Sequence, residues 1–457
     1  MKKSLLLVSL LLATIAFSAN LYAEDKEQPA SEDSSETLDV ETLKDQDVSK
    51  DVENKYFPQP EEIGTIGADL AALTDAFVFK FKNDISLKLY GKIEMLTYYD
   101  TTSPAVSDWL AYVYQKGTYD GDHSSYSMSV RGSPVGIFFE LPNAIKTAAM
   151  HAKLEVDFVG GFTSGANSTY SPLLRLKQAW ASIDGKHVKF LAGQSFGIFN
   201  PLFPDTGSWI ALGTSGNPWI RLPQLRLTID YAPIIFEVSA NRPMAANEAF
   251  GNQVDDIISD GEQSNMPFFM GRLGFYKTFG KDVKFSTGVS GVYGRENIHR
   301  TETNATTGVV STLDKTLPSW LFGYDVKIIT KYIDFLAEFF MGSNVNQFYA
   351  GVLQGVNVNI PAGTANAIDT IGGWGQITYK PTDKLYFNFG AGIDDPKNSD
   401  LVSGDQRTSN LTVYMNGNYK FNKWFRIGLE PCYTRTAYLN KNTNYDIRGL
   451  LRTSFIF

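Results

Sequence analysis

The stretch Ile85-Ser86-Leu87-Lys88-Leu89-Tyr90-Gly91-Lys92-Ile93-Glu94-Met95 decides the fold, because its polarity alternates with a period of two residues. In an extended strand, successive side chains point to opposite faces, so all the charged residues of this stretch share one face. That face does not contact lipid, since a Lys or Arg exposed to lipid at mid-membrane costs about 2–4 kcal/mol. The stretch therefore predicts a strand with one face toward hydrocarbon and the other toward a water-filled lumen.

The same alternation recurs in sixteen segments, and the connections between them alternate between short and long. We place the segments at about 85–99, 125–140, 147–160, 172–183, 186–196, 223–231, 234–241, 267–279, 282–294, 320–331, 333–342, 370–379, 384–394, 408–421, 424–437 and 446–457. The short connections are at 142–143, 184–185, 232–233, 280–281, 331–332, 381–383 and 422–423, and the long ones include 100–124, 197–222, 295–319 and 343–369. An even strand number with tight turns at one end and long loops at the other is typical of bacterial outer-membrane barrels. We therefore expect an all-β fold, a transmembrane antiparallel β-barrel of about 16 strands that occupies 85–457.

The part of the chain before residue 85 is expected to lie outside the barrel wall. Two lysines, an apolar run at 5–17 and small residues up to Ala23 predict a cleaved signal peptide at 1–23. Residues 24–62 contain 14 acidic residues and 4 lysines, which predicts a disordered acidic tail in the periplasm. Residues 63–84 are expected to form a linker or a short helix at the barrel mouth, through Leu70, Leu73 and Phe77.

The composition and the last residue agree with this interpretation. The chain has 23 Tyr, 31 Phe and 39 Gly but only one cysteine, Cys432, so its stability must come from backbone pairing and packing and not from disulfides. The final strand ends in Phe457, which resembles the sorting signal that outer-membrane proteins present to the barrel-assembly machinery. A large soluble all-β protein is the alternative that composition alone leaves open.

No pattern in the sequence indicates catalysis. His151 shares the inward parity of Lys153, His123 and His299 lie in predicted loops, and His187 lies beside a predicted turn. No catalytic triad, metal-ligand spacing or phosphate-binding glycine loop is recognisable. We therefore expect no enzymatic activity, no catalytic residue, no metal, no cofactor and no nucleic-acid partner.

Phasing each strand by its apolar face gives the side chains that are expected to point into the lumen. The predicted pore-lining residues are Lys88, Lys92, Glu94, Lys153, Glu155, Asp157, Arg175, Lys177, Arg226, Arg272, Lys284, Asp325, Lys327 and Glu338. Opposed basic and acidic walls create a transverse field that influences which solutes pass. The alternative is that these charges pair across neighbouring strands and only stabilise the wall.

One long loop is expected to narrow the pore. The loop at 197–222 is the most apolar and aromatic of the long loops, and folding inward would bury its apolar side chains. Its predicted constriction residues are Phe199, Phe203, Asp205, Trp209 and Trp219. Packing of this loop against a neighbouring subunit is the alternative.

Several short segments resemble the DcaP-like family of trimeric outer-membrane porins. They are Leu87-Lys88-Leu89-Tyr90-Gly91-Lys92-Ile93, Leu154-Glu155-Val156-Asp157-Phe158, Leu174-Arg175-Leu176-Lys177-Gln178-Ala179-Trp180, Ala192-Gly193-Gln194, Pro223-Gln224-Leu225-Arg226 and Gly373-Trp374-Gly375-Gln376. The acidic tail departs from the family pattern, because it lacks the heptads of the family's periplasmic coiled coil. The resemblance implies uptake of dicarboxylates and similar small anions, with Arg175, Lys177 and Arg226 lining the narrowest part of the pore.

Together these observations predict a passive diffusion channel in the outer membrane for small polar or anionic solutes. Its expected surroundings are outer-membrane lipid and lipopolysaccharide, and the resemblance adds a homotrimer. The competing hypothesis is a structural or adhesion-type surface barrel with a closed lumen.

Overall fold

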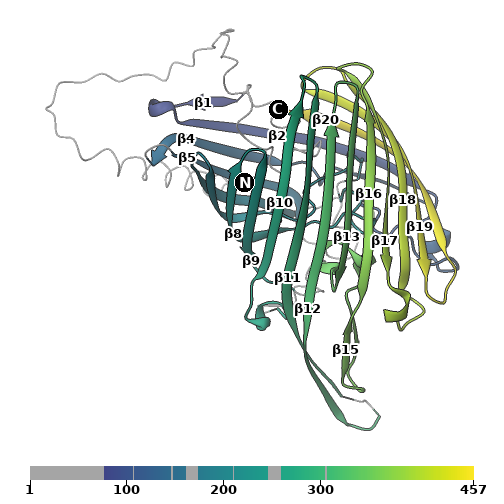
Figure 1. Ribbon diagram of the computed structural model, residues 1–457. Coiled ribbons are helices and arrows are strands. Elements are labelled where there is room, and N and C mark those ends of the chain that lie inside the picture. Colours follow the sequence, from purple (N-terminus) through teal and green to yellow (C-terminus); the bar gives the residue numbers. More distant parts are fainter. Residues whose placement is uncertain are drawn as a thin grey trace, which may run out of the picture. The chain divides into compact units, whose positions relative to one another are not determined.

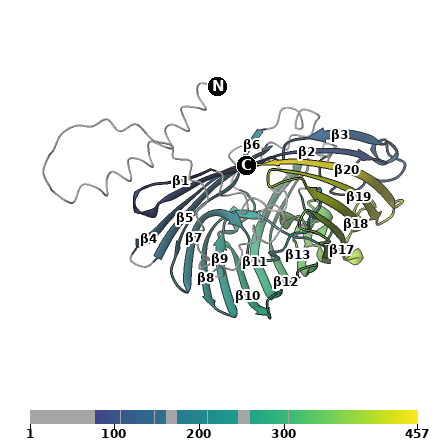
Figure 2. The same cartoon turned by 90° about the horizontal axis from the view of Figure 1, so that it is seen from above.

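The computed structural model describes residues 77–105, 108–145, 148–160, 173–208, 210–244, 259–303 and 306–457, which form a closed antiparallel barrel of 16 strands. The strands of the wall are β2 (Ser86–Asp100), β3 (Ser125–Ser129) with β4 (Val135–Ile145), β5 (Ala148–Gly160), β6 (Leu173–Asp184), β7 (Val188–Phe196), β8 (Arg221–Tyr231), β9 (Ile234–Asn241), β10 (Phe268–Phe279), β11 (Val283–Thr303), β12 (Val310–Ile329), β13 (Ile333–Ser343), β16 (Asp369–Tyr379), β17 (Leu385–Pro396), β18 (Arg407–Lys420), β19 (Phe425–Tyr438) and β20 (Asn444–Ile456). Figure 1 shows the wall from the side, and Figure 2 shows the strands following one another around a ring. The predicted fold class is confirmed.

The barrel closes between its first and last wall strands. Residues Lys92–Asp100 of β2 pair with β20 in antiparallel register, with Lys92 opposite Ile456 and Asp100 opposite Arg448. The terminal residue continues this pairing, because the N–H of Phe457 donates to the carbonyl of Gly91 at 2.9 Å. Closure leaves no unpaired edge, which is the condition for a sheet to cross a bilayer. A further strand, β1 (Val78–Lys80), pairs with the first residues of β2.

Side chains alternate around the wall as the sequence predicts. In β2, Leu89 and Ile93 are exposed on the outer face, whereas Tyr90, Lys92 and Glu94 are buried on the inner face. The same outward exposure recurs on the other strands, at residues that include Leu176, Leu225, Leu273, Phe322, Phe339, Ile377, Phe389, Met415, Leu429 and Leu451. The outer surface is therefore an apolar band, while the inner surface carries the ionic side chains.

Most predicted strand limits agree with the structure, but three regions differ. The segment expected at 125–140 is two strands, because the chain leaves the sheet between Ser129 and Val135. The prediction of a loop at 295–319 is wrong. Strand β11 continues to Thr303 and β12 begins at Val310, and the two strands project beyond the rest of the wall (Figure 1). The loop expected at 343–369 contains short 3-10 turns at Asn346–Phe348 and Gly351–Leu353 and a hairpin of β14 (Val356–Asn359) and β15 (Thr364–Ala367).

The projecting part of β11 and β12 is stabilised by packing against that hairpin. Ile298 of β11, Leu313 of β12 and Ala365 of β15 form one buried cluster. Further 3-10 turns lie at Lys82–Asp84, Asp120–Asp122, Glu262–Ser264 and Asn398–Asp400. Among the described residues, no helix is both long enough and apolar enough to cross a membrane.

The predictions for the N-terminal region are largely outside the described residues. This applies to the signal peptide at 1–23, the acidic tail at 24–62 and residues 63–76 of the linker or helix. Of the segment expected to be a linker or a short helix, the structure describes residues 77–84, in which Val78–Lys80 form strand β1 and Lys82–Asp84 form a 3-10 turn.

Candidate functional site

A row of basic side chains runs along the inner face of β5–β8. We call Lys153, Arg175, Lys177, Lys189 and Arg221 the basic ladder. Each of the first four pairs with an inward-facing carboxylate: Arg175 with Asp157 at 2.7 Å, Lys177 and Lys153 with Glu155 at 2.6 and 3.5 Å, and Lys189 with Asp184 at 3.2 Å. The carboxylates are almost fully buried, while 11–22% of each of these four basic side chains is exposed. The cations of the ladder therefore present more surface to the lumen than their partners do.

A β-bulge in β6 places two of these cations on the inner face. The pairing of β5 with β6 shifts after Glu155, so that Gln178 is opposite Glu155 while Leu176 is opposite Val156. The extra residue, Lys177, lets Gln178 and Trp180 face inward on one side of the bulge and Arg175 face inward on the other. Without a bulge, strict alternation would send one of these two sets to the lipid face.

Arg221 is a member of the ladder that the sequence analysis missed. It was assigned to the end of the 197–222 loop, but it is the first residue of β8. Its guanidinium lies over the rings of Phe196 and Trp219, 5.1 Å from each centroid, and within electrostatic range of Asp157. The missed signal was a cation directly after an apolar loop, where rings are available for stacking.

The other predicted pore-lining residues are less accessible or lie elsewhere. Lys92 and Glu94 form a buried ion pair at 2.7 Å, and Arg272 and Asp325 form another at 2.8 Å. Arg226 is buried, and it donates to Gln224 Oε1 at 2.9 Å and to the carbonyl of Phe196. Lys284 and Lys327 are at least partly exposed and lie near strand ends that tight turns connect, whereas Lys88, also partly exposed, lies near the start of β2.

The loop between β7 and β8 lies against the inner wall. Phe199, Leu202 and Trp219 are buried in clusters with side chains of the wall strands, and Phe203 packs against the first of these clusters. Trp209, also predicted for the constriction, lies outside the described residues. We call the described residues of this segment, 197–208 and 210–220, the inner loop.

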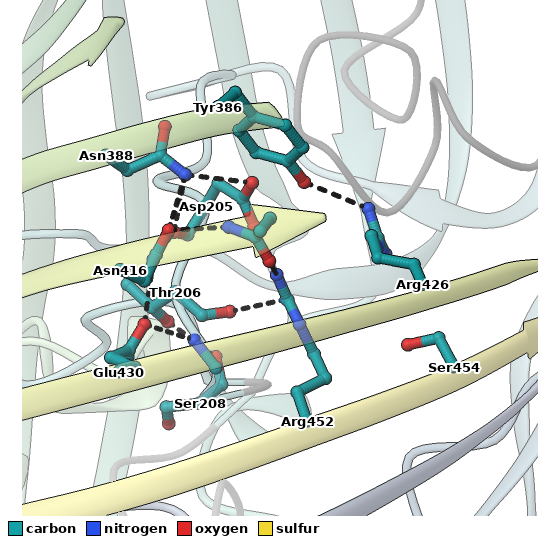
Figure 3. A network of polar contacts seen from close by, with 12 residues as sticks. Asp205, Thr206, Ser208, Tyr386, Asn388, Asn416, Arg426, Glu430, Arg452 and Ser454 are labelled. Carbon is teal, nitrogen blue, oxygen red and sulfur yellow. Dashed lines mark hydrogen bonds and ion pairs between the residues drawn. The ribbon is translucent and has the colours of Figure 1, made fainter. Parts of the chain in front are cut away.

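Asp205 fastens the inner loop to the wall and does not face the solvent (Figure 3). Its carboxylate accepts hydrogen bonds from Asn388 Nδ2 at 3.0 Å and from Arg452 Nη2 at 3.2 Å. Its backbone is also held, since its N–H donates to Gln376 Oε1 at 2.7 Å and its carbonyl accepts from Asn416 Nδ2 at 2.6 Å. We call these five residues, Asp205, Gln376, Asn388, Asn416 and Arg452, the loop latch.

Three buried wall carboxylates hold the inner loop by its backbone N–H groups. Glu338 accepts from Leu202 at 2.7 Å, Glu430 from Gly207 at 2.6 Å, and Asp394 from Gly216 at 2.7 Å. Glu338 also accepts from Trp374 Nε1 at 2.9 Å, so this predicted pore-lining residue lies behind the loop. Each of these bonds gives a partner to a backbone N–H of the loop that burial would otherwise leave without one. The three carboxylates therefore anchor the inner loop to the wall.

Two further loops also enter the barrel, and sequence reasoning did not single them out. Trp109, before β3, and Tyr349, after β13, contact each other with ring centroids 5.8 Å apart, and Tyr349 lies 4.8 Å from Trp219 of the inner loop. Backbone bonds join the loops as well, because the N–H groups of Thr214 and Trp219 donate to the carbonyls of Tyr349 and Phe348. The available signal was the apolar content of 109–113 and 345–353. The three loops form one packed body inside the barrel.

Neither a metal centre nor a reactive thiol stands out in the described part of the chain. No three His, Cys, Asp or Glu side chains there are grouped to hold a metal ion. Cys432 is buried and lines a cavity of about 20 Å³ behind the inner loop, together with Ser208, Tyr414 and Glu430. A cavity of this size holds about one water molecule.

Comparison with known proteins finds likeness in structure only. No family model matches the sequence, and no curated protein matches it either. The crystal structure of the outer membrane channel DcaP of Acinetobacter baumannii aligns with a TM-score of 0.65 and 15% identity, over 83% of this chain and 100% of that one. OmpT of Vibrio cholerae aligns with a TM-score of 0.51 and 11% identity, over 83% and 100%, and OprB of Pseudomonas putida with 0.50 and 11%, over 81% and 94%. The expected likeness to DcaP-like porins is therefore confirmed for the fold, and the chain has the barrel architecture of the DcaP channel.

Proposed function

We propose that this protein is an outer-membrane porin, a passive diffusion channel for small hydrophilic solutes. The observation that carries the proposal is the division of the wall, with an apolar outer band on all sides and ionic side chains inside. Such a division suits hydrocarbon outside and water inside, because each unpaired charge on the outer face would be costly. The likeness in fold to an outer membrane channel supports the same function.

The proposed channel prefers anions. The basic ladder contains five cations and is paired with three carboxylates, Glu155, Asp157 and Asp184, so these eight side chains together have two more positive than negative charges. The carboxylates Glu338, Asp394 and Glu430 are buried and accept backbone N–H groups of the inner loop. An ion that passes between the ladder and the loop therefore meets mainly basic surface. The sign of the charge that lines a constriction determines which ions a channel favours.

The spacing of the ladder supports dicarboxylates as solutes. Asp157 with Arg175, Glu155 with Lys177, and then Lys153 occupy successive inward-facing levels of β5 and β6. Successive inward-facing levels of a strand are about 6.6 Å apart. A small molecule with two carboxylates at such a separation can contact two levels at once.

The remaining parts of the proposal concern assembly and location. The tight turns and the tail face the periplasm, and the outer band contacts lipid and lipopolysaccharide. Phe457, which pairs with Gly91 at the closure of the barrel, is the contact for the barrel-assembly machinery. The homotrimer rests on the resemblance to DcaP-like porins. The channel acts without catalysis or a cofactor.

Liposome swelling tests the proposal. Purified barrel in liposomes should admit a small dicarboxylate faster than a neutral sugar of similar size, whereas liposomes without protein admit neither. Equal rates for the two solutes would refute the anion preference. Absence of any uptake, with the barrel shown to be folded by its heat-modifiable mobility on gels, would refute the channel.

A closed surface barrel is the second candidate, and one observation favours it. The three inner loops, with Trp109, Trp219 and Tyr349 at their contact, fill part of the interior with apolar packing. A barrel whose loops close the lumen would serve adhesion or membrane structure, and its liposomes would stay impermeable to both solutes.

A further inference from the structure

Glu155 differs from the other two carboxylates of the basic ladder because it pairs with two cations of the ladder, whereas Asp157 and Asp184 each pair with one. One oxygen, Oε1, pairs with Lys177 Nζ at 2.6 Å. The other, Oε2, accepts from Tyr90 OH at 2.9 Å and lies 3.5 Å from Lys153 Nζ. Asp157, one level nearer the long loops, pairs with Arg175 alone of the ladder.

Its position explains how these three groups converge. Glu155 is opposite the β-bulge, so Lys177 of β6 reaches it from one side while Lys153 approaches along β5. Tyr90 of β2 closes the group, because the ammonium of Lys153 also lies over its ring, 5.6 Å from the centroid. Residues of three strands thus meet on one carboxylate.

The negatively charged carboxylate of Glu155 is less accessible than the two positively charged ammonium groups that it pairs with. Only 4% of the Glu155 side chain is exposed, against 11% for Lys177 and 13% for Lys153. An ion in the lumen approaches the two ammonium groups more closely than the carboxylate. The negative charge of Glu155 still cancels one of the two positive charges of Lys177 and Lys153. The carboxylate also fixes the positions of both ammonium groups.

We infer that Glu155 is the specificity-determining residue of the channel, a positioning residue that sets how much positive charge the ladder presents to a passing anion. The inference rests on the proposed function and deepens it. If it holds, the anion preference is limited by this carboxylate and is not set by the number of basic residues alone. Loss of the carboxylate should raise the preference.

Reversal potentials across planar bilayers in a salt gradient test the inference. Glu155→Gln keeps the shape and the acceptor for Tyr90 but removes the charge. The anion-to-cation permeability ratio should rise by about threefold, because one unit charge roughly 7 Å away in water with about 0.1 M salt changes the local anion concentration by about 1.6-fold and the cation concentration by the inverse factor. Glu155→Asp keeps the charge and should restore a ratio close to that of the original protein, which a purely structural role would not predict.

Two further variants guard against misinterpretation. Lys177→Gln removes the nearer partner and should lower the ratio by a similar factor, so the inference can be tested even where Glu155→Gln fails to fold. Glu302→Gln makes the same chemical change as Glu155→Gln at an exposed site on the projecting part of β11, and the ratio should not move.

The outcomes separate the inference from the proposed function. A channel that prefers anions and keeps its ratio in Glu155→Gln would overturn the inference and leave the proposed function intact. A channel without anion preference would refute the proposed preference, yet a threefold rise in Glu155→Gln would still support Glu155 as the residue that sets the ratio. A fall in the ratio in Glu155→Gln would overturn the inference.

Discussion

Replacing Asp205 with alanine should release the inner loop and expose Cys432 behind it. The carboxylate of Asp205 binds Arg452 and Asn388, and all three side chains are buried. Removing one partner of a buried ion pair costs about 3–5 kcal/mol, because the other charge is left uncompensated. If about 3 kcal/mol of this falls on the closed state of the loop, opening becomes roughly a hundredfold more frequent.

The single cysteine makes this opening measurable. Cys432 is buried and lines the small cavity between the wall and the inner loop, so a thiol reagent reaches it only after the loop moves. Folded protein in detergent would be treated with a maleimide-coupled polymer, and modification would be followed as a shift on gels. The rate in Asp205→Ala should exceed that of the original protein by about a hundredfold, the ratio expected from the opening equilibrium.

Matched variants make the result interpretable. Asp314→Ala removes a carboxylate that is 79% exposed on the projecting part of β12, and it should label at the original rate. Cys432→Ser should give no labelling at all. Equal rates in Asp205→Ala and Asp314→Ala would refute the loop latch, and so would fast labelling of the original protein.

Three more predictions concern charge and stability. Arg175→Gln should lower the anion-to-cation permeability ratio by about threefold in reversal-potential measurements, because it removes one ladder cation while Asp157 keeps its charge. Asp100→Asn should destabilise the barrel by about 3 kcal/mol, since it breaks a buried ion pair with Arg448 whose hydrogen bonds are 2.6 and 3.2 Å long. The loss of stability would appear as faster loss of the heat-resistant band on gels, and Asp405→Asn, at an exposed position, is the control that should behave like the original protein. Leu225→Arg, on the outer face, should cost about 2–4 kcal/mol in urea unfolding from vesicles, whereas Val309→Arg, near the tip of the projecting hairpin, should cost little.

The wall could be predicted from the sequence because each strand has one face toward hydrocarbon and one toward water, so apolar and polar side chains alternate along it. Strand β9 has the limits that the alternation gave, and the wall has the expected sixteen strands. The alternation fails where β11 and β12 leave the membrane. There, both faces of the hairpin contact water or β14 and β15, so residues such as Asn297 and Thr316 carry no alternation although their backbones still pair.

The interior could be predicted only in part. The apolar content of the inner loop indicated that it is buried, but nothing local indicated that Trp109 and Tyr349, distant in sequence, would pack beside it. Asp205 was expected in the constriction. Its contacts with Asn388, Asn416 and Arg452 depend on how three distant strands are placed in the folded wall, so the sequence did not indicate them. Strand parity gave the direction of Arg175 and Lys177, whereas their partners depend on the register of β5 and β6.

The conductance of single channels in planar bilayers tests most directly whether this barrel carries ions through a basic lumen. Folded protein should insert in discrete steps of constant conductance, and in a salt gradient the current should reverse at the potential expected of an anion-preferring pore. Folded protein that inserts without conducting, or that conducts with a cation preference, would contradict the account.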